Sequence, residues 1–426
     1  MSTLEDAGAY LFAQGPESLL ALFWFAILFE VPKYTLSFIA AATVALMRSQ
    51  RPAIDEQRVQ SGLGRISVII AGHNEADFIA RSVHAIREQS LKPDEIIVVS
   101  DGSVDAMPGR VRQLLSAGLI DQAHCTMLRA GKSAATNLAL RLSSGDIIVN
   151  VDCDSTFDRD ALKEIVRPFA DPRVGGVSGN ILVGNAHQSL IAGFQAIEYL
   201  ISISLGKQAA AITDHVVCIS GAFGAFRRRA LMGIDGLDVG GGEDLDATLR
   251  LRKHGWRVRF APDAICYTDV PATLPALLNQ RFRWERDAIR LRYRKHGDML
   301  RPLGRGFSPV ELGHGLDFTV FSIVASIAFP IYVGWLVVAY GNLAPVILVA
   351  AQVGMLGFEA IAFLLAALVT PRVRALGLLP YLFGYGFYSS LGMRFLRVAA
   401  YAQEWLFVRS IEDGYVPPKV RLTRKW

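Results

Sequence analysis

Cysteine is scarce in this chain, which has four in 426 residues. They are scattered along the sequence, with no C-x-x-C pair and no spacing typical of a zinc site. The four are Cys125, Cys153, Cys218 and Cys266. Their arrangement argues against a disulfide-stabilised secreted domain and against a structural zinc centre. We expect reduced, buried thiols, consistent with a cytosolic location.

Charged residues are also few, at 19% of the chain, whereas 52% of the residues are hydrophobic. Four mostly apolar stretches are each long enough to cross about 30 Å of hydrocarbon. They occupy residues 19–47, 316–340, 343–369 and 376–400. The first has no basic region before it and no small-residue cleavage site after it, so it does not read as a cleaved signal peptide. The sequence predicts a multi-pass protein of the cell (inner or plasma) membrane.

Basic residues gather beside these stretches, within a modest net charge of +5. Arg48, Arg51, Arg58 and Arg65 follow the first stretch, and a second group lies within 281–305. By the positive-inside rule, the segment 49–315 is cytoplasmic. Nucleic-acid binding also uses basic residues, but placement beside the spans favours anionic membrane lipids. We therefore expect membrane lipids, and no nucleic acid, among the partners.

The side of the membrane that holds the C-terminal tail stays open. One span before the cytoplasmic segment and three after it place the tail outside, whereas its basic residues favour the inside. Those residues are Arg409, Lys419, Arg421, Arg424 and Lys425. Arg394 and Arg397 fall within the last apolar stretch, which is therefore either a span or a re-entrant or interfacial segment. In the first stretch, Glu30 and Lys33 are three residues apart and could pair on one helix face.

The stretch 146–154, DIIVNVDCD, carries the central chemical signal. Its β-branched run predicts a buried strand, which ends in Asp152 and Asp154. Side chains two residues apart point to the same side of an extended chain, so both carboxylates can converge on one cation. Hard oxygen ligands after such a strand suit Mg²⁺ or Mn²⁺ bridging a diphosphate. Taken alone, a D-x-D pattern is more often a solvated loop after a core strand.

Strand and helix patterns alternate from Arg65 onward. The predicted strands are 66–71, 95–100, 125–128 and 147–149, and the predicted helices between them are 77–89, 111–117 and 131–142. Three of these strands end in polar triplets, which are HNE, DGS and DCD. Alternating βα units with apolar strands predict a doubly wound parallel sheet that binds ligands at the carboxyl ends of its strands. Three such triplets together argue against a solvated loop far more strongly than one.

The second half of this segment adds polar residues at element ends. The pattern predicts a strand pair or one bent strand at 174–183, a long amphipathic helix at 188–208 and a basic amphipathic helix at 275–293. Ser220 and Gly221 open a small-residue run where the backbone can approach a ligand closely. Gly242, followed by Glu243 and Asp244, marks the start of a further helix. On its own, the basic helix around Trp284 reads as a membrane-surface helix.

These motifs, in this order, resemble those of the inverting, membrane-embedded GT-A glycosyltransferases of family 2, which include cellulose, chitin, hyaluronan and poly-N-acetylglucosamine synthases. The matching residues are Asp101 in DGS, Lys132 and Asn137 in G-K-x-x-x-x-N, Asp152-Cys153-Asp154 as D-x-D, Glu243-Asp244 as E-D, and Gln280-Arg281-Phe282-Arg283-Trp284 as Q-x-x-R-W. The resemblance covers residues 65–290. His73 departs from it, since relatives often carry tyrosine before Asn-Glu.

The resemblance implies an α/β GT-A cytoplasmic domain, with a Rossmann-like mixed sheet, inserted between transmembrane α-helices. The expected domains are a transmembrane helix at 1–48, the GT-A domain at 49–294 ending in an interfacial Q-x-x-R-W helix, an interfacial segment with transmembrane helices at 295–403, and a basic tail at 404–426.

The resemblance also implies a role for each motif. Asp244 is the expected general base, and a Mg²⁺ or Mn²⁺ ion is expected on Asp152 and Asp154. The residues expected to contact a UDP-sugar donor are Asn74, Glu75, Asp101, Lys132, Asn137, Asp152, Gln280 and Arg283. Those expected to contact the acceptor are Glu243, Trp284, Ser220 and Gly221.

The leading hypothesis is a processive synthase that polymerises a β-linked polysaccharide by inversion and helps to translocate it. The alternative is transfer of a single sugar to a membrane lipid, since Q-x-x-R-W occurs in that branch too. A transporter or receptor with a regulatory nucleotide-binding domain is less favoured, because few polar residues fall within the apolar stretches. Four or fewer spans are a thin wall for a polymer channel, so a small membrane partner subunit or a homo-oligomer is expected.

Overall fold

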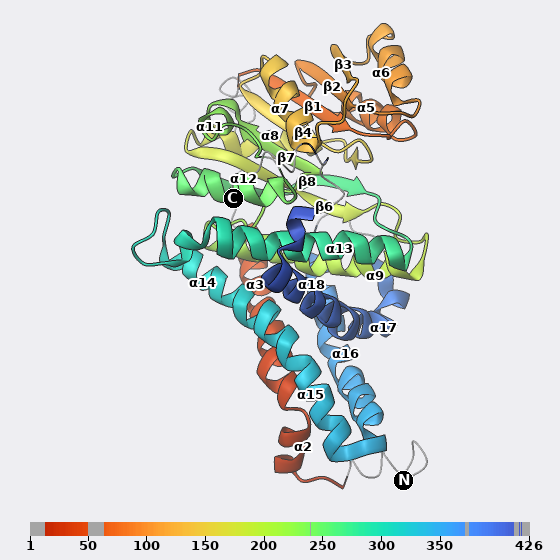
Figure 1. Ribbon diagram of the computed structural model, residues 1–426, viewed down its shortest axis with the longest axis vertical. Helices are drawn as coiled ribbons and strands as arrows, with labels where there is room; N and C mark the ends of the chain where they lie inside the picture. The colour runs from red at the N-terminus through yellow and green to blue at the C-terminus, as the bar shows by residue number, and fades with distance from the viewer. Residues whose placement is uncertain are drawn as a thin grey trace.

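The computed structural model describes residues 13–49, 64–238, 240–370 and 375–412, together with Pro417 and Lys419. A domain built around a β-sheet forms one end of the molecule, and long helices extend from it (Figure 1). Some of the basic residues expected beside the spans and in the tail lie outside the described residues. They are Arg51, Arg58, Arg421, Arg424 and Lys425.

The strands of the described residues form one eight-stranded sheet in the order β3-β2-β1-β4-β7-β6-β8-β5. Their bounds are β1 Ile66–Gly72, β2 Glu95–Asp101, β3 Gln122–Thr126, β4 Ile147–Val151, β5 Thr156–Phe157, β6 Val174–Val183, β7 Phe223–Arg227 and β8 Arg257–Thr268. β3, β2, β1 and β4 are parallel. β7 is antiparallel to β4 and β6, β8 is parallel to β6, and β5 is antiparallel to β8.

The four strands from which a parallel sheet was predicted are indeed parallel, and the sheet as a whole is mixed, as the family resemblance implies. β7 breaks the parallel order because the chain enters it beside the carboxyl end of β4, where the Asp152 amide donates to the Ala222 carbonyl over 3.3 Å. From there β7 runs back along β4. The stretch 174–183 is one strand, β6, with register shifts at Gly176 and Asn180. The strand expected at 125–128 begins three residues earlier, at Gln122.

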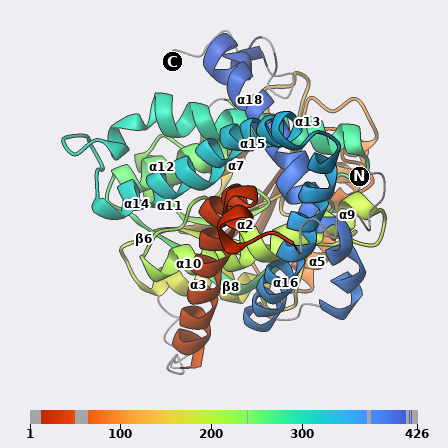
Figure 2. The same cartoon turned by 90° about the horizontal axis from the view of Figure 1, so that it is seen from below.

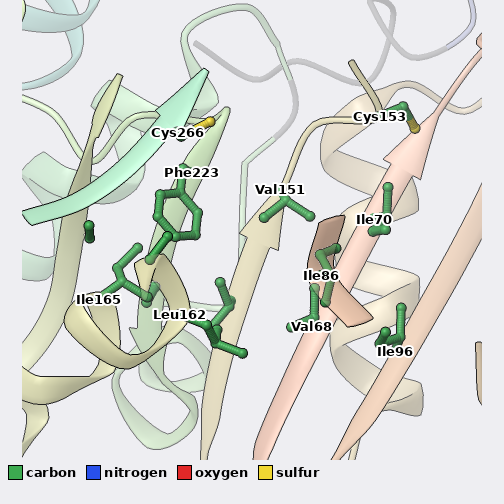
Figure 3. Close-up of a cluster of buried hydrophobic side chains, with 14 of the residues drawn as sticks. Val68, Ile70, Ile86, Ile96, Val151, Cys153, Leu162, Ile165, Phe223 and Cys266 are labelled. Atoms are coloured by element: carbon green, nitrogen blue, oxygen red, sulfur yellow. The ribbon is translucent and has the colours of Figure 1, made fainter. Parts of the chain in front are cut away.

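Helices cover both faces of the sheet, so its central strands are buried on both sides. One face carries α5 Ile79–Arg87, α6 Met107–Ser116 and α8 Ala161–Val166, and the other carries α7 Lys132–Leu142, α11 Arg228–Gly233 and α12 Glu243–Lys253. Because successive residues of a strand point to opposite faces, Val68 and Ile70 join the first core, whereas Ile69 joins the second. Figure 3 shows the first core between β1 and α8.

A long helical segment and a basic helix separate the sheet from the apolar helices (Figure 1). The first comprises α9 Leu190–Glu198, the π-helix η3 Tyr199–Leu205 and α10 Gly206–Ile212, which match the helix expected at 188–208. The second is α13 Leu274–Ile289, which continues into the π-helix η4 Arg290–Lys295.

The apolar helices lie beneath the domain, where α3, α15 and α16 are grouped with α2 (Figure 2). Their bounds are α2 Pro16–Leu22, η1 Ala26–Glu30, α3 Val31–Ser49, α14 Pro309–Phe318, η6 Thr319–Val324, α15 Ala325–Tyr340 and α16 Ala344–Val369. In the described residues, two helical stretches are long and apolar enough to cross a membrane, Ala26–Met47 and Pro309–Val369. The second turns at Gly341 (φ +53°), so α15 and α16 form the two arms of a hairpin (Figure 1).

The last apolar stretch, 376–400, is not one continuous helix. It contains the 3₁₀ turn η8 Ala375–Tyr381, the short α17 Leu382–Gly386, the π-helix η9 Phe387–Gly392 and most of α18 Met393–Phe407. Phe383 and Gly384 have non-helical dihedral angles, and Gly384 has a φ of +99° that favours glycine. The α18 helix then lies along α13 (Figure 1). This break favours the re-entrant or interfacial interpretation over a simple span.

The arginines of α13 and η4 correct the expectation of a helix whose cationic face meets lipid headgroups. Arg281 is buried and bonds Glu198 over 2.7 Å. Arg294 lies 2.9 Å from Glu404, and Arg397 of α18 lies 2.9 Å from Glu285. Glu30 likewise pairs with Arg394 of α18 rather than with Lys33. These ion pairs join segments far apart in the sequence, which is why helix spacing alone does not predict them.

Candidate active site

The carboxyl ends of β2, β1 and β4 meet at one edge of the sheet, because these strands are neighbours. The HNE, DGS and DCD triplets therefore come together, as their positions predicted. They border a cavity of about 150 Å³. Its lining comprises Ala71, Gly72, His73, Glu75, Asp101, Arg129, Lys132, Ala135, Asp152 and Asp154. The structure thus gathers five of the predicted site residues around one polar cavity.

Lys132 is the first residue of α7 and places its ammonium between two carboxylates. Its Nζ lies 2.5 Å from Asp152 Oδ1 and 3.8 Å from Glu243 Oε1. The preceding residue, Gly131, has a φ of +95°, which glycine adopts without strain and which turns the chain into the helix. The lysine charge and the helix N-terminus both favour an anion at this point.

Glu75 and Asp154 are acidic residues held in a partly dehydrated cavity wall. Burial raises the pKa of Asp154 to about 6, and the neighbouring Asp152 adds to that rise. Burial likewise raises the pKa of Glu75 to about 7, again with contributions from Asp152 and Asp154. Glu75 Oε2 is buried and has no hydrogen-bond partner within the described part of the chain. This wall is therefore short of positive charge.

A divalent cation fits that deficit. Asp152 and Asp154 offer only oxygen ligands, which Mg²⁺ and Mn²⁺ prefer. Among the described residues, no three His, Cys, Asp or Glu side chains are grouped closely enough to hold an ion by themselves. This agrees with the usual manner of magnesium binding, in which one or two carboxylates act together with substrate phosphates and water.

Asp101 is buried, and its carboxylate accepts hydrogen bonds from two backbone amides. Oδ1 accepts from the Ala130 amide over 2.8 Å and Oδ2 accepts from the Gly131 amide over 2.6 Å. Asp101 thereby fixes the loop that leads into Lys132. Its expected contact with the donor nucleotide stays a prediction, and any such bond must use the remaining lone pairs.

Asn74 joins the loops that follow β1 and β2. Its backbone is left-handed (φ +59°), its amide donates to Ser103 Oγ over 3.1 Å, and its Oδ1 accepts from the Val104 amide over 2.8 Å. The neighbouring His73 Nδ1 lies 2.8 Å from the Asp101 carbonyl oxygen. These contacts shape the cavity rim, and donor binding by Asn74 stays a prediction.

Asn137 is placed differently from its expected donor role. Its Nδ2 donates to the Leu237 carbonyl over 2.7 Å, and its Oδ1 accepts from the Leu237 amide over 2.8 Å. Asn137 is absent from the cavity lining. Both ends of its side-chain amide thus hold the loop that leads to Glu243, and its donor role stays a prediction.

The predicted acceptor loop separates Lys132 from Asp244. The Gly221 amide donates to Asp244 Oδ2 over 3.4 Å, and the Gly221 carbonyl accepts from Asn150 Nδ2 over 2.8 Å. A methyl group placed on Gly221 would lie 3.3 Å from Lys132 Nζ and 3.7 Å from Asp244 Oδ2. Gly221 therefore lies beside both the cationic end of the cavity and the expected base.

Glu243 and Asp244 open α12, as predicted. Gly242 precedes them with a φ of +67°, and Asp244 Oδ1 accepts from the Leu245 amide over 2.7 Å. Glu243 is buried, and burial raises its pKa to about 7 against the opposing effect of Lys132. Glu243 thus lies near Lys132 of the cavity lining, and Asp244 lies beside Gly221 of the acceptor loop.

The Q-x-x-R-W residues lie on α13, outside the cavity lining. Gln280 Oε1 is buried with no hydrogen-bond partner among the described residues. Trp284 is 37% exposed, and the Arg281 guanidinium lies 4.6 Å from its ring centroid. One residue past α13, Arg290 donates to the Gly241 carbonyl over 2.5 Å. The helix therefore abuts the start of α12, and the roles of Gln280, Arg283 and Trp284 stay predictions.

Two positioning side chains went unnoticed in the sequence. Lys207 of α10 donates to Ser220 Oγ over 2.5 Å, and Thr248 Oγ1 accepts from the Ile219 amide over 2.9 Å. Lys207 stands in a mostly apolar helical segment, which is a signal that could have found it. Thr248 has no such signal, because threonine is common on helices.

Comparison with known proteins assigns this arrangement to a family. The family model described as glycosyltransferase like family 2 matches residues 64–286. An N-acetylglucosaminyltransferase of Rhizobium meliloti is 30% identical over 271 residues, which cover 61% of this chain and 62% of that protein. A poly-β-1,6-N-acetyl-D-glucosamine synthase of Staphylococcus aureus is 29% identical over 224 residues, covering 51% and 53%. The chain spans less than two thirds of the length of these curated relatives.

Among solved structures, a mannosyltransferase from Pyrobaculum calidifontis, in complex with GDP-Man and Mn²⁺, has a TM-score of 0.59. The match covers 91% of this chain and 99% of that chain at 21% sequence identity. At this identity the likeness concerns the fold, and it confirms the GT-A architecture implied by the sequence motifs.

Proposed function

This chain belongs to the glycosyltransferase like family 2, and from that premise we propose that it transfers a sugar from a UDP-sugar to a β-glycan acceptor with inversion. The observation that carries the proposal is the position of Gly221 between Lys132 and Asp244. It allows a donor diphosphate beside Lys132 and an acceptor hydroxyl beside Asp244 to meet across a single backbone segment.

The proposed reaction is one displacement at the anomeric carbon. The acceptor hydroxyl oxygen forms a bond to C1 as the bond from C1 to the diphosphate oxygen breaks. Asp244 takes the hydroxyl proton, and UDP leaves with the electron pair of the broken bond. Attack from the face opposite UDP converts an α-linked donor into a β-linked product. Lys132 lies beside the growing negative charge of the leaving group.

Asp152 and Asp154 would hold a Mg²⁺ or Mn²⁺ ion together with diphosphate oxygens. When bound, such an ion stabilises negative charge on the leaving diphosphate. The buried, charge-deficient carboxylates of the cavity wall support this assignment.

The names of the relatives favour UDP-N-acetylglucosamine as donor. We propose processive synthesis of a β-linked polysaccharide as the leading function. Transfer of one sugar to a membrane lipid is the alternative, favoured by the position of α12, which carries Asp244, on the side of the sheet domain nearer the apolar helices (Figure 1).

We place the catalytic domain at the cytoplasmic face of the cell membrane, held by the two apolar helical stretches. Few helices are available to surround a polymer, so translocation would need a second copy or a small membrane subunit. A purified monomer that both extends and translocates a polymer would count against this part of the proposal.

The decisive experiment is radiolabel incorporation by the purified full chain in proteoliposomes. UDP-N-acetylglucosamine, UDP-glucose and UDP-glucuronate are supplied separately with Mg²⁺ or Mn²⁺, and Asp244→Asn is the control. Polymer that forms with one donor and is absent from the control supports the synthase. A single labelled sugar on extracted lipid supports the alternative. No transfer from any donor contradicts the proposed function.

A further inference from the structure

A buried lysine contacts the predicted acceptor loop. Lys207 of α10 is 7% exposed. Its ammonium donates to Ser220 Oγ over 2.5 Å and to Ser178 Oγ over 2.9 Å. No carboxylate of the described chain forms an ion pair with it. Lys207 is not among the residues that border the cavity.

Two hydroxyl groups are weak compensation for a buried ammonium. Removal of such a charge from water is unfavourable unless a nearby counter-charge offsets it, and burial lowers the pKa of Lys207 although Cys218 and Asp244 act in the opposite direction. An apolar side chain of similar length would pack at this point without that cost. A lysine here is therefore poorly explained by packing alone, and its contacts point to another role.

The contacts of Lys207 lead to the expected base within two residues. Ser178 Oγ accepts a hydrogen bond from the Lys207 ammonium, and it also accepts one from the Ser220 amide over 3.2 Å. Ser220 is thus held through both its side chain and its backbone. The next residue, Gly221, donates its amide to Asp244 Oδ2. The Asp244 carboxylate is in turn fixed at its other oxygen by the Leu245 amide.

We propose that Lys207 is a positioning residue for Asp244, acting through Ser220 and Gly221. The inference rests on the proposed function, in which Asp244 receives the acceptor proton. Lys207 holds the Ser220–Gly221 segment against α12, so that the Gly221 amide orients Asp244 toward the acceptor hydroxyl. Loss of Lys207 frees this segment and misplaces the base without removing any group that contacts the donor.

The test compares Lys207→Met with wild type in the full-length protein. A base displaced by about 1 Å costs about 100-fold in rate, so kcat should fall about 100-fold. The KM for the donor and the Kd for UDP should change less than about twofold, because uniform binding is untouched. The Tm in detergent should be equal or higher, since a buried charge is gone. Lys253→Met is the matched control, because Lys253 bonds Asp298 at the other end of α12; its kcat should be unchanged.

A double-mutant cycle tests whether Lys207 acts through its serine contacts. If Lys207 acts by holding Ser220 together with Ser178, the loss of activity in Lys207→Met/Ser178→Ala should be smaller than the product of the two single losses, whereas independent effects would multiply. Unchanged kcat in Lys207→Met overturns the inference. A fall of several degrees in Tm together with lost UDP binding also overturns it, because it identifies a packing residue. Transfer by wild type and its loss in Asp244→Asn test the proposed function separately.

Discussion

Two acidic residues in the first turn of α12 differ in their ion pairs and in the direction of their pKa shifts, one beside the candidate active site and one in the scaffold. Glu243 and Asp246 are both buried. Burial raises the pKa of Glu243 to about 7, and its cationic neighbour, Lys132, is 3.8 Å away. Burial acts on Asp246 in the same direction, but there His296, Arg250 and Lys295 outweigh it and lower the pKa. The three lie 2.7 to 2.8 Å from its carboxylate.

The opposite pKa shifts of the two carboxylates follow from their different surroundings. A fully paired carboxylate such as Asp246 is stable but has no capacity left for a ligand. Glu75 and Asp154 line a cavity whose missing positive charge a substrate complex can supply, and Glu243 lies 3.8 Å from Lys132 in the same lining. Perturbed carboxylates that gather in a cleft are a recognised mark of function. The contrast predicts that mutations of cavity carboxylates and of fully paired carboxylates will separate activity from stability.

Asp244→Asn should have the largest effect on activity. Loss of a positioned general base lowers the rate by about 100-fold to 10⁴-fold, while the amide preserves the shape of the side chain. The Tm should change little, because Asp244 has no ion pair to break among the described residues. Incorporation of labelled sugar and thermal unfolding of the same sample measure both effects. Retention of more than about a tenth of wild-type kcat would show that Asp244 is not the base.

Asp246→Asn should reverse that pattern. It leaves Arg250, Lys295 and His296 around a neutral group, and unpairing buried charges costs about 3 to 5 kcal/mol. The Tm should fall markedly, and the UDP Kd of the surviving folded protein should remain near that of wild type.

The Asp246→Asn variant should also change how the stability of the protein depends on pH. Because the folded-state pKa of Asp246 is lowered, its stabilisation is complete above the ordinary aspartate pKa of about 3.9 and is lost as pH falls through the lower folded value. Wild type should therefore lose stability more steeply than Asp246→Asn below about pH 4. Parallel pH curves, or an unchanged Tm at neutral pH, would contradict the scaffold role.

Asp152→Asn should act on the metal. Loss of one carboxylate ligand should lower activity about 100-fold at limiting Mn²⁺, with partial recovery at high Mn²⁺. Binding of Mn²⁺ in the presence of UDP, followed by electron paramagnetic resonance, should weaken in parallel. EDTA should abolish wild-type activity, and added Mn²⁺ should restore it. Full activity in EDTA would remove the metal from the proposal.

Local sequence patterns predicted the part of the site that depends on neighbouring strands. The apolar runs of β1, β2 and β4 are unambiguous, and parallel strands end at a common edge, so Glu75, Asp101 and Asp152 were expected to meet. β7 was missed because its five residues, FGAFR, show no clear alternation. The register that places Gly224 beside Asn150 depends on the folded sheet.

Long-range pairing explains the other differences. Nothing near Arg281 in the sequence predicts Glu198 as its partner, so the helix around it looked like a membrane-surface helix. The position of Lys207 behind Ser220 likewise depends on how α10 packs. A family motif identifies a residue but not its hydrogen-bond partners, so the motifs did not predict that Asp101 and Asn137 bond backbone groups.

The smallest effect on activity should come from Asn137→Ala. Asn185→Ala is its matched comparison, outside the family motifs. Asn185 makes the same two-bond contact with the Val270 backbone that Asn137 makes with Leu237, but Asn185 is not a motif residue. Loss of either amide leaves a backbone donor and acceptor unpaired, which costs about 1 to 3 kcal/mol. Asn137→Ala and Asn185→Ala should therefore lower the Tm by similar amounts. Neither should raise the KM for the donor by more than about twofold. A donor KM that rises in Asn137→Ala alone would restore the donor-binding role that the family resemblance implies, and would mean that Asn137 leaves Leu237 when substrate binds.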